Sequence, residues 1–330
     1  MQLAASDFSG RVTFVTGPEK HCGKTTLLNA ALGLLRAAGE RPAFLGVGFD
    51  GEARDSLTAA RKPRIRVEAG EVFVSAERYL RAAPCLPEIL EALPGSSALG
   101  RLALARARRG GEVTLVGPER NEYAAWAIAR IAEEAWARSV VVDGAINRIT
   151  QVSAFSGARF LFALRAAPAD LERQVRRMRL IRALAELPVV GRADRAAAAA
   201  AAGGGDTFPA AAPDRGDTDG TALDAAAEAA GLPAPAFALK GPLTAETARC
   251  VPESARSVVV DDFTKIFLDG PALEAFRRGR ALAVADGIEF GGFSVVLRDL
   301  SRARFLEALG DGRLAALVAF NPYETEARSA

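Results

Sequence analysis

The sequence is poor in the residues that most often build metal centres and acid–base catalysts. It has one histidine, His21, in 330 residues, and three cysteines, Cys22, Cys85 and Cys250. A single imidazole excludes metal sites made of several histidines and catalytic devices that need a second one. Three well-separated cysteines without a CxxC pair argue against a structural zinc site and a disulfide framework, which favours a reducing, cytoplasmic compartment.

Long apolar runs and a large net charge are also missing. No run approaches the roughly 18 apolar residues that span a bilayer, and the N-terminus has no basic segment followed by an apolar core. Lysine and arginine total 42 against 40 acidic residues, which gives a net charge of +2. We therefore expect no membrane segment and no global electrostatic attraction to nucleic acid.

Lysine is scarce as well, since the chain has 37 arginines and only five lysines. Two of those five, Lys20 and Lys24, stand beside His21. A guanidinium fork is wide, whereas an ammonium is compact and fits inside a tight loop. The clustering of lysine therefore directs attention to one short segment, residues 17–26.

Half of the residues are apolar, which is enough to build a folded core. A length of 330 residues favours two domains. We expect a nucleotide-binding domain over residues 1–190 and a smaller α/β domain over residues 223–330. Between them, residues 191–222 contain seven consecutive alanines followed by three consecutive glycines, which indicates a flexible low-complexity linker or insertion.

Short apolar runs and helical periodicities alternate along the chain. Two hairpins are expected, one joining 65–67 to 72–74 and one joining 102–105 to 113–116. The alternation predicts a three-layer α/β fold with a mostly parallel sheet plus a second, smaller α/β unit, and the motif at residues 17–26, described next, makes the expected fold that of a P-loop NTPase. The expected strands are 12–16, 43–47, 140–143, 160–164, 236–239, 257–260, 266–268, 293–297 and 316–320, and the expected helices are 24–38, 121–138 (with Asn121 as N-cap) and 171–187.

The strongest motif is Gly-Pro-Glu-Lys-His-Cys-Gly-Lys-Thr-Thr at residues 17–26, which we call the phosphate-loop motif. A glycine-rich turn between a strand and a helix lets backbone N–H groups and the helix N-terminus surround a phosphate. Lys24 would bring a charge to the β and γ phosphates, and the Thr25 hydroxyl is positioned to ligate Mg²⁺. ATP and Mg²⁺ are the expected cofactors, since no Asn-Lys-x-Asp motif selects guanine.

The loop is longer than usual, because five residues separate its first glycine from Gly-Lys where four are common. This spacing is similar to that of dethiobiotin synthetase and cobyric acid synthase. Lys20 supplies either a second charge or a solvated one, and His21 either touches phosphate or is exposed. Cys22 is a small loop residue rather than a nucleophile. The predicted nucleotide-binding set is Gly17, Lys20, His21, Cys22, Gly23, Lys24, Thr25 and Thr26.

A metal-binding acid is expected at the carboxyl end of a strand. Asp143, which ends an all-valine run, is the first candidate for Mg²⁺, the alternative being a turn residue. Asp50, with Glu52 close by, is the second candidate for a metal or water-positioning role. Asp261 and Asp262 are weaker candidates, because no phosphate-binding motif accompanies them.

Arg148 follows the Asp143 strand and either stabilises a transferring phosphate, as an arginine finger does, or is a solvated charge. The predicted catalytic set is therefore Lys24, Asp50, Asp143 and Arg148, and the predicted metal ligands are Thr25, Asp50 and Asp143.

Several stretches together resemble a known family, the P-loop (KamB-like) subunit of the lysine 5,6-aminomutase reactivating system. The resemblance covers most of residues 11–150 in order and the C-terminal part more loosely, with departures after Thr150 and in the linker. The stretches that carry it are the phosphate-loop motif with Leu27 to Asn29, Gly46 to Asp55, Leu57-Thr58, Lys62 to Ile65, Gly117-Pro118, Asp143 to Arg148, Asp262 to Phe267 and Asn321-Pro322.

The resemblance implies an accessory ATPase for an adenosylcobalamin-dependent aminomutase. Such a reactivase, or chaperone component, uses ATP to exchange damaged cobalamin for intact cofactor, together with a MutS-like ATPase partner. It implies Mg·ATP contacts from Lys24, Thr25, Asp50 and Asp143. The chain has no Asp-x-His-x-x-Gly motif, so any cobalamin is expected to be held by the partner enzyme. The sequence leaves open whether this chain forms a homodimer.

Two other functions are compatible with the same residues. One is an ATP-dependent ligase or small-molecule kinase of the dethiobiotin synthetase type, which the loop spacing favours. The other is a nucleotide-binding regulator that hydrolyses little ATP.

Overall fold

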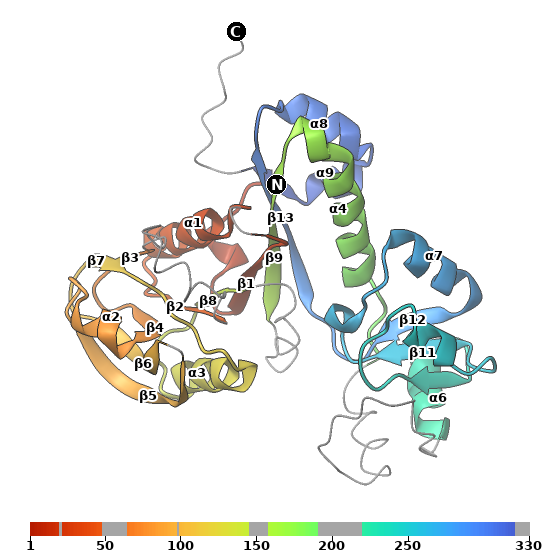
Figure 1. Cartoon of the computed structure of the whole chain (residues 1–330), viewed down its shortest axis with the longest axis horizontal. Coiled ribbons are helices and arrows are strands. Elements are labelled where there is room, and N and C mark those ends of the chain that lie inside the picture. The colour runs from red at the N-terminus through yellow and green to blue at the C-terminus, as the bar shows by residue number, and fades with distance from the viewer. Residues whose placement is uncertain (20–21, 48–64, 98, 145–157, 191–219, 321–330) are drawn as a thin grey trace. The chain divides into compact units, whose positions relative to one another are not determined.

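The computed structural model describes residues 1–19, 22–47, 65–97, 99–144, 158–190 and 220–320 (Figure 1). The chain divides into two compact units. Unit 1 comprises Met1–Gln174 together with Phe290–Ala330, and unit 2 comprises Val175–Glu289. This division differs from the expected boundaries at 190 and 223, because the last part of the chain returns to unit 1. The expected linker lies mostly outside the described residues, and its end, from Gly220, begins a helix.

Unit 1 is built on a nine-stranded sheet with the order β14-β13-β9-β1-β8-β2-β4-β6-β5. The pairs β9–β1, β1–β8, β8–β2, β2–β4 and β13–β14 are parallel, whereas β6 runs antiparallel to β4 and β5. The strands are β1 (Val12–Thr16), β2 (Ala43–Gly46), β4 (Val72–Ala76), β5 (Pro87–Ser97), β6 (Gly100–Ala107), β8 (Val140–Asp143), β9 (Arg159–Ala166), β13 (Glu289–Leu297) and β14 (Val318–Phe320).

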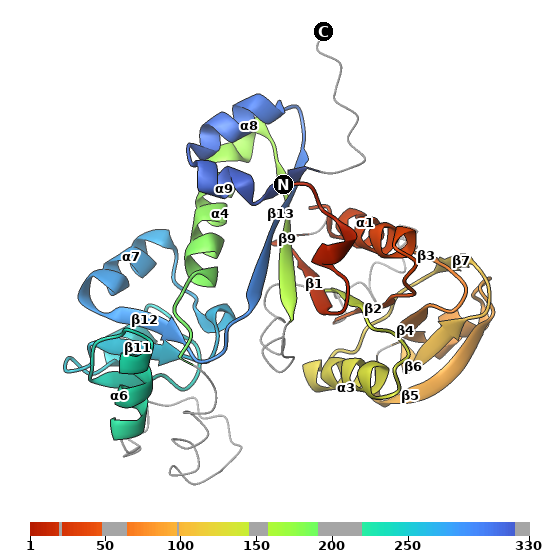
Figure 2. The ribbon, with the colours of Figure 1, turned by 180° about the vertical axis from the view of Figure 1, so that it is seen from behind.

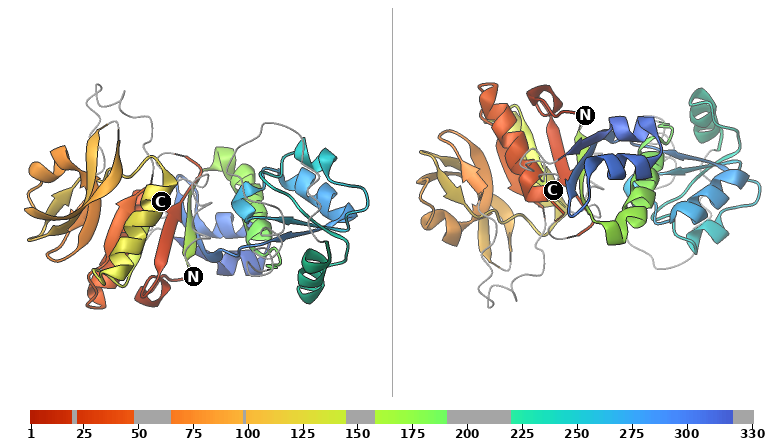
Figure 3. Two further views of the ribbon diagram at one scale, coloured as in Figure 1. Left: turned by 90° about the horizontal axis from the view of Figure 1, so that it is seen from below. Right: turned by 90° about the horizontal axis from the view of Figure 1, so that it is seen from above.

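The centre of this sheet is parallel and buried on both faces, which suits its nearly continuous Val, Phe and Leu runs. Helix α1 (Lys24–Ala37) covers one face, and its buried leucines pack with Val15, Val141 and Leu161 of three adjacent strands. Helix α3 (Asn121–Glu133) lies on the other face, as the side, bottom and top views agree (Figures 1 and 3). The other helices of unit 1 are α2 (Glu77–Arg81), α8 (Arg302–Leu309) and α9 (Gly312–Ala316), with short 3-10 turns at Ala5–Asp7 and Pro168–Asp170.

Both expected hairpins are wrong. Strand β3 (Ile65–Val67) pairs with β7 (Gly111–Val113) in a separate two-stranded sheet, whereas β4 and β6 pair with each other in the large sheet. The hairpin in this region is instead β5–β6, two strands joined by a tight turn. The expectation paired strands that are neighbours in the sequence. In the structure, each of these strands pairs with a more distant one, β3 with β7 and β4 with β6.

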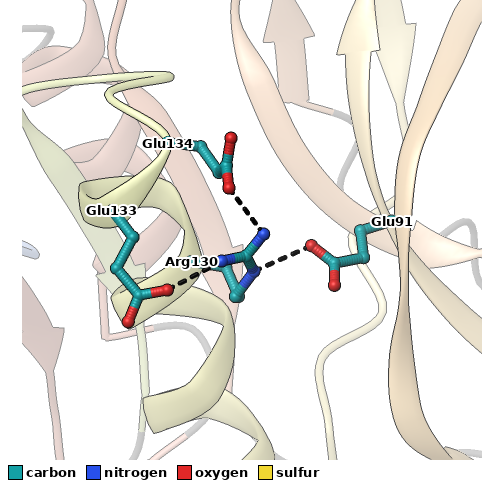
Figure 4. A network of polar contacts seen from close by, with 4 residues as sticks. All are labelled: Glu91, Arg130, Glu133 and Glu134. Atoms are coloured by element: carbon teal, nitrogen blue, oxygen red, sulfur yellow. Dashed lines mark hydrogen bonds and ion pairs between the residues drawn. The ribbon is translucent and has the colours of Figure 1, made fainter.

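Helix α3 is shorter than expected. It ends at Glu133 rather than near residue 138, and Ala135 adopts a positive φ of 50° just after it. Arg120, not Asn121, precedes its first turn. Near its end, Arg130 forms ion pairs with Glu133, Glu134 and, at 2.9 Å, Glu91 of β5 (Figure 4). The last pair links the helix to the edge of the sheet.

A buried ion pair fastens α1 to the start of β4. Glu71 is 1% exposed and accepts two hydrogen bonds from the Arg36 guanidinium, at 2.6 and 2.8 Å. The same carboxylate accepts a 2.8 Å hydrogen bond from the backbone N–H of Glu68, and Arg36 also donates to the carbonyl of Arg66. All charges in this contact therefore have partners, as a buried charge requires.

Unit 2 is a smaller α/β unit. Its three-stranded parallel sheet has the order β10-β11-β12, with Val189 adding a single parallel bridge to β12. The expected strand at 266–268 is wrong, because only Ile266 forms one isolated bridge, to Leu243. The elements are α4 (Leu171–Ala185, which begins in unit 1), α6 (Gly220–Ala229), β10 (Ala236–Ala238), β11 (Ser257–Val260), α7 (Gly270–Gly279) and β12 (Ala281–Val284), with 3-10 turns at Thr247–Cys250 and Phe263–Lys265.

These findings confirm an α/β class with a large, mostly parallel sheet and a smaller α/β unit. Within the described ranges, no helix combines the length and apolarity that crossing a bilayer requires.

Candidate functional site

The phosphate-loop motif lies between β1 and α1, as its sequence predicts. Strand β1 ends at Thr16, and α1 begins at Lys24 with Gly23 as its N-cap. Gly23 has a φ of 101°, a left-handed conformation that favours glycine. A Cβ added there would also come within 2.7 Å of Val296 on β13. This position therefore requires glycine for both backbone and steric reasons.

Gly17 is equally constrained at the other end of the loop. A Cβ on Gly17 would lie 2.5 Å from Cys22 Sγ and 2.7 Å from the carbonyl oxygen of Ala163 on β9. Both distances are far below a normal contact. The loop thus closes tightly on itself and against β9, and the missing side chain at Gly17 makes this possible.

The Lys24 side chain turns back over the loop. Its Nζ donates a 2.7 Å hydrogen bond to the carbonyl oxygen of Glu19 and lies 3.8 Å from Cys22 Sγ. The ammonium is therefore held against the backbone of the loop itself. The motif predicts that the same ammonium acts on phosphate oxygens.

The first turn of α1 offers backbone donors at the end of the same loop. Leu27 N–H bonds to the Gly23 carbonyl and is the first N–H with a partner inside the helix. The N–H groups of Lys24, Thr25 and Thr26 precede it, and Gly23 has no side chain to cap them. Such donors, together with the positive end of the helix dipole, form an anion-binding position.

Asp143 lies on the strand next to the loop. Strands β1 and β8 are parallel neighbours, with Val15 directly opposite Asp143, and Gly144 N–H bonds to the Val15 carbonyl. Because side chains alternate along a strand, Asp143 faces the same side as the buried Val141, which packs under α1. The predicted carboxylate is thereby brought to the α1 side of the sheet, at the end from which the loop departs.

Strand order indicates a ligand crevice at the same place. From β1 the chain leads through α1 to β2 on one side, whereas from β9 it leads to β13 on the other side, and β1 and β9 are adjacent (Figures 1 and 2). In parallel α/β sheets, ligands bind outside the carboxyl ends of strands where the connections diverge in this way.

Cys22 belongs to the core rather than to the ligand face. It is 1% exposed and packs with Leu27, Leu28 and other buried residues. Its side chain is therefore not available as an exposed nucleophile, in line with the prediction that Cys22 is a small loop residue. Four other predicted site residues, Lys20, His21, Asp50 and Arg148, lie outside the described residues.

The weaker carboxylate candidates have local partners in unit 2. Asp261 pairs with Lys265, and the buried Asp262 accepts a 2.8 Å hydrogen bond from Thr264 N–H, which caps the turn at Phe263–Lys265. Burial raises the pKa of Asp262, and the bonds from Thr264 oppose that rise only in part. These contacts give both carboxylates a structural role within unit 2.

The sequence did not identify Ala163 and Val296, two residues of distant segments that pack against Gly17 and Gly23 of the loop. Neither residue belongs to a motif, so no local signal could have found them. Among the described residues, no group of three His, Cys, Asp or Glu side chains could hold a metal ion. No family model, curated protein or solved structure matches this chain, so the nature of the site is inferred from its own residues.

Proposed function

We propose that unit 1 binds Mg·ATP at the phosphate-loop motif and hydrolyses it. The observation that carries the proposal is the loop between β1 and α1, in which the Lys24 ammonium bonds to the carbonyl of Glu19 and α1 begins directly with Lys24, Thr25 and Thr26. An ammonium and helix N-terminal N–H donors in one loop suit a polyphosphate better than a neutral ligand.

The residues present also fit a magnesium ion that arrives with the nucleotide. Thr25 offers a hydroxyl in the first turn of α1, and Asp143 offers a carboxylate from the adjacent strand. Two protein ligands are few for a metal held by the protein alone, but Mg²⁺ in nucleotide sites takes its remaining ligands from phosphate and water. Its chemistry there is to neutralise charge on the phosphates.

Several described residues in and near the motif have distinct roles in this proposal. Lys24 exchanges the Glu19 carbonyl for phosphate oxygens, which keeps its ammonium bonded in both states. Gly17 and Gly23 let the backbone approach the phosphates closely. The helix N–H groups orient the phosphate chain, and Asp143 fixes the metal side of the site.

We further propose that ATP use drives reactivation of an adenosylcobalamin-dependent aminomutase, with a MutS-like ATPase as the second component. This task is inferred from the resemblance of residues 11–150 to the KamB-like family. Nucleotide binding would shift a two-state element, and hydrolysis would reset it. The second candidate, a ligase or kinase of the dethiobiotin synthetase type, is favoured by the five residues between Gly17 and Gly23.

One experiment separates these functions. The purified chain is incubated with Mg·ATP, and phosphate release is measured alone and with an inactivated aminomutase plus the MutS-like partner. We expect slow basal hydrolysis that rises with the partners, and no reactivation by Lys24→Ala. Rapid phosphorylation or ligation of a small molecule without partners would support the ligase or kinase instead. Absence of ATP binding would refute the whole proposal.

A further inference from the structure

Strand β9 extends beyond the end of β1 and runs beside the phosphate-loop motif. Thr16, the last residue of β1, lies opposite Phe162, but β9 continues to Ala166. Gly17 follows Thr16, and the position of its missing Cβ is 2.7 Å from the Ala163 carbonyl oxygen. On the side of β1, the last four residues of β9 therefore extend past the end of that strand, and Ala163 lies against the loop.

One of these four residues is Arg165. The side chains of Leu161 and Ala163 pack with α1 residues in the buried cluster on the α1 side of the sheet. Because side chains alternate along a strand, Arg165 points to that same side. It lies about 7 Å beyond Ala163 along the strand. Arg165 and Asp143 thus stand on the two strands that flank β1, both on the α1 side.

The charge of Arg165 has no acidic partner in the part of the chain that the structure describes, although its side chain is partly buried. Arg159, at the other end of β9, contrasts with it, because Arg159 pairs with Asp7 at 2.9 Å. Removing a guanidinium from water costs free energy unless an anion compensates. A planar guanidinium is also the group best shaped to bind a phosphate through two hydrogen bonds.

We infer that Arg165 binds the phosphate chain of the nucleotide from the β9 side, opposite Asp143. This inference rests on the proposed nucleotide binding and adds a residue that no sequence motif marks. It would give the site cations on two sides of the phosphates, Lys24 from the loop and Arg165 from the sheet.

The test compares Arg165→Ala and Arg165→Lys with the unaltered full-length chain. Arg106→Ala is the matched control, because Arg106 is also a partly buried strand arginine without an ion pair among the described residues, but it lies on β6. Affinity is measured for Mg·ATP by titration of a fluorescent analogue. Displacement of that analogue by inorganic tripolyphosphate isolates the phosphate contribution. Thermal unfolding and circular dichroism verify that each variant is folded.

We expect Arg165→Ala to weaken both Mg·ATP and tripolyphosphate by about 10-fold or more, as loss of a charge-assisted hydrogen bond does. Arg165→Lys should recover part of that loss, since it keeps the charge without the fork. Arg106→Ala should bind as the unaltered chain does. If the folded Arg165→Ala and Arg165→Lys variants bind both ligands as tightly as Arg106→Ala does, the inference about Arg165 is overturned while nucleotide binding stands. If the unaltered chain binds neither ligand, both fail together.

Discussion

Lys24 Nζ and the backbone carbonyl of Glu19 are joined by a 2.7 Å hydrogen bond across the phosphate-loop motif. The bond orients the ammonium toward the loop backbone, so in the proposed nucleotide site less side-chain entropy would be lost on binding. The proposed phosphate ligand would have to replace that carbonyl as the acceptor.

Lys24→Ala is expected to weaken Mg·ATP by at least about 10-fold, because a hydrogen bond to a charged group is lost. The affinity is measured by isothermal titration at constant salt. Lys240→Ala, at an exposed lysine after β10, is the control and should leave the affinity unchanged. Equal affinity of the two variants would show that the nucleotide is not held at this loop.

Gly17→Ala is expected to abolish nucleotide binding and to lower the free energy of unfolding by about 1–3 kcal/mol, as overpacking does. Its new methyl group would collide with Cys22 Sγ and the Ala163 carbonyl. Gly33→Ala is the matched control, since a Cβ at this position in α1 meets nothing within 4 Å. It should stabilise the helix by about 0.5–1 kcal/mol and keep binding intact. Urea unfolding checks both values, and a Gly17→Ala variant as stable as the unaltered chain would contradict the described packing.

Glu71→Ala is expected to cost about 3–5 kcal/mol, because it leaves the Arg36 guanidinium without its buried partner. Arg36 is 15% exposed in this pair and Glu71 is 1% exposed. The exposed pair of Glu77 with Arg81 provides the comparison, and Glu77→Ala should change stability by less than about 0.5 kcal/mol. Chemical denaturation of both variants gives the two numbers. Similar losses for the two variants would mean that burial does not set the strength of the first pair.

Glu40 predicts a loss of stability in acid. Burial alone would raise the pKa of this carboxyl, but hydrogen bonds from Ser139 and Ser9 and the charge of Arg138 outweigh burial, so its pKa lies below the ordinary 4.5. Its stabilising contribution is therefore complete above about pH 4.5 and is lost as the pH falls through the pKa of the folded state.

The check is the difference in unfolding free energy between the unaltered chain and Glu40→Gln. This difference should be present at pH 7 and should shrink at an acid pH below the pKa of the folded state, because the carboxyl is then protonated in both states. Glu253→Gln, at an exposed position, should show no such change. A Glu40→Gln difference that is equal at both pH values would refute the coupling.

The elements around the loop could be predicted from the sequence because their signals are local. Strand β1, helix α1 and strand β8 each carry their own pattern, and the structure gives β1 and β8 the expected bounds and α1 one residue fewer. Pairing could not be predicted in the same way, because it depends on contacts between distant segments. The return of β13 to the sheet is the clearest case, since its apolar run was expected in a separate domain.

Strand β5 escaped prediction for a different reason. It contains Pro87 and Pro94, which argue against a central strand, and helix-forming residues between them. Proline is tolerated at the edge of a sheet, where one side of the strand needs no donor. Strand β5 is the last strand of the large sheet, so the position that permits these prolines is known only once the fold is known.

The return of the chain to unit 1 has a consequence for synthesis on the ribosome. Strands β13 and β14 are synthesised after unit 2, although they lie on the β9 side of the large sheet. Until then the nascent chain presents β9 as an open edge, which is a template for pairing with other chains. The loop around Gly23 also lacks Val296 until that moment. A nascent or truncated chain that stops before β13 is therefore expected to aggregate, and the proposed nucleotide binding should begin only after β13 has been synthesised.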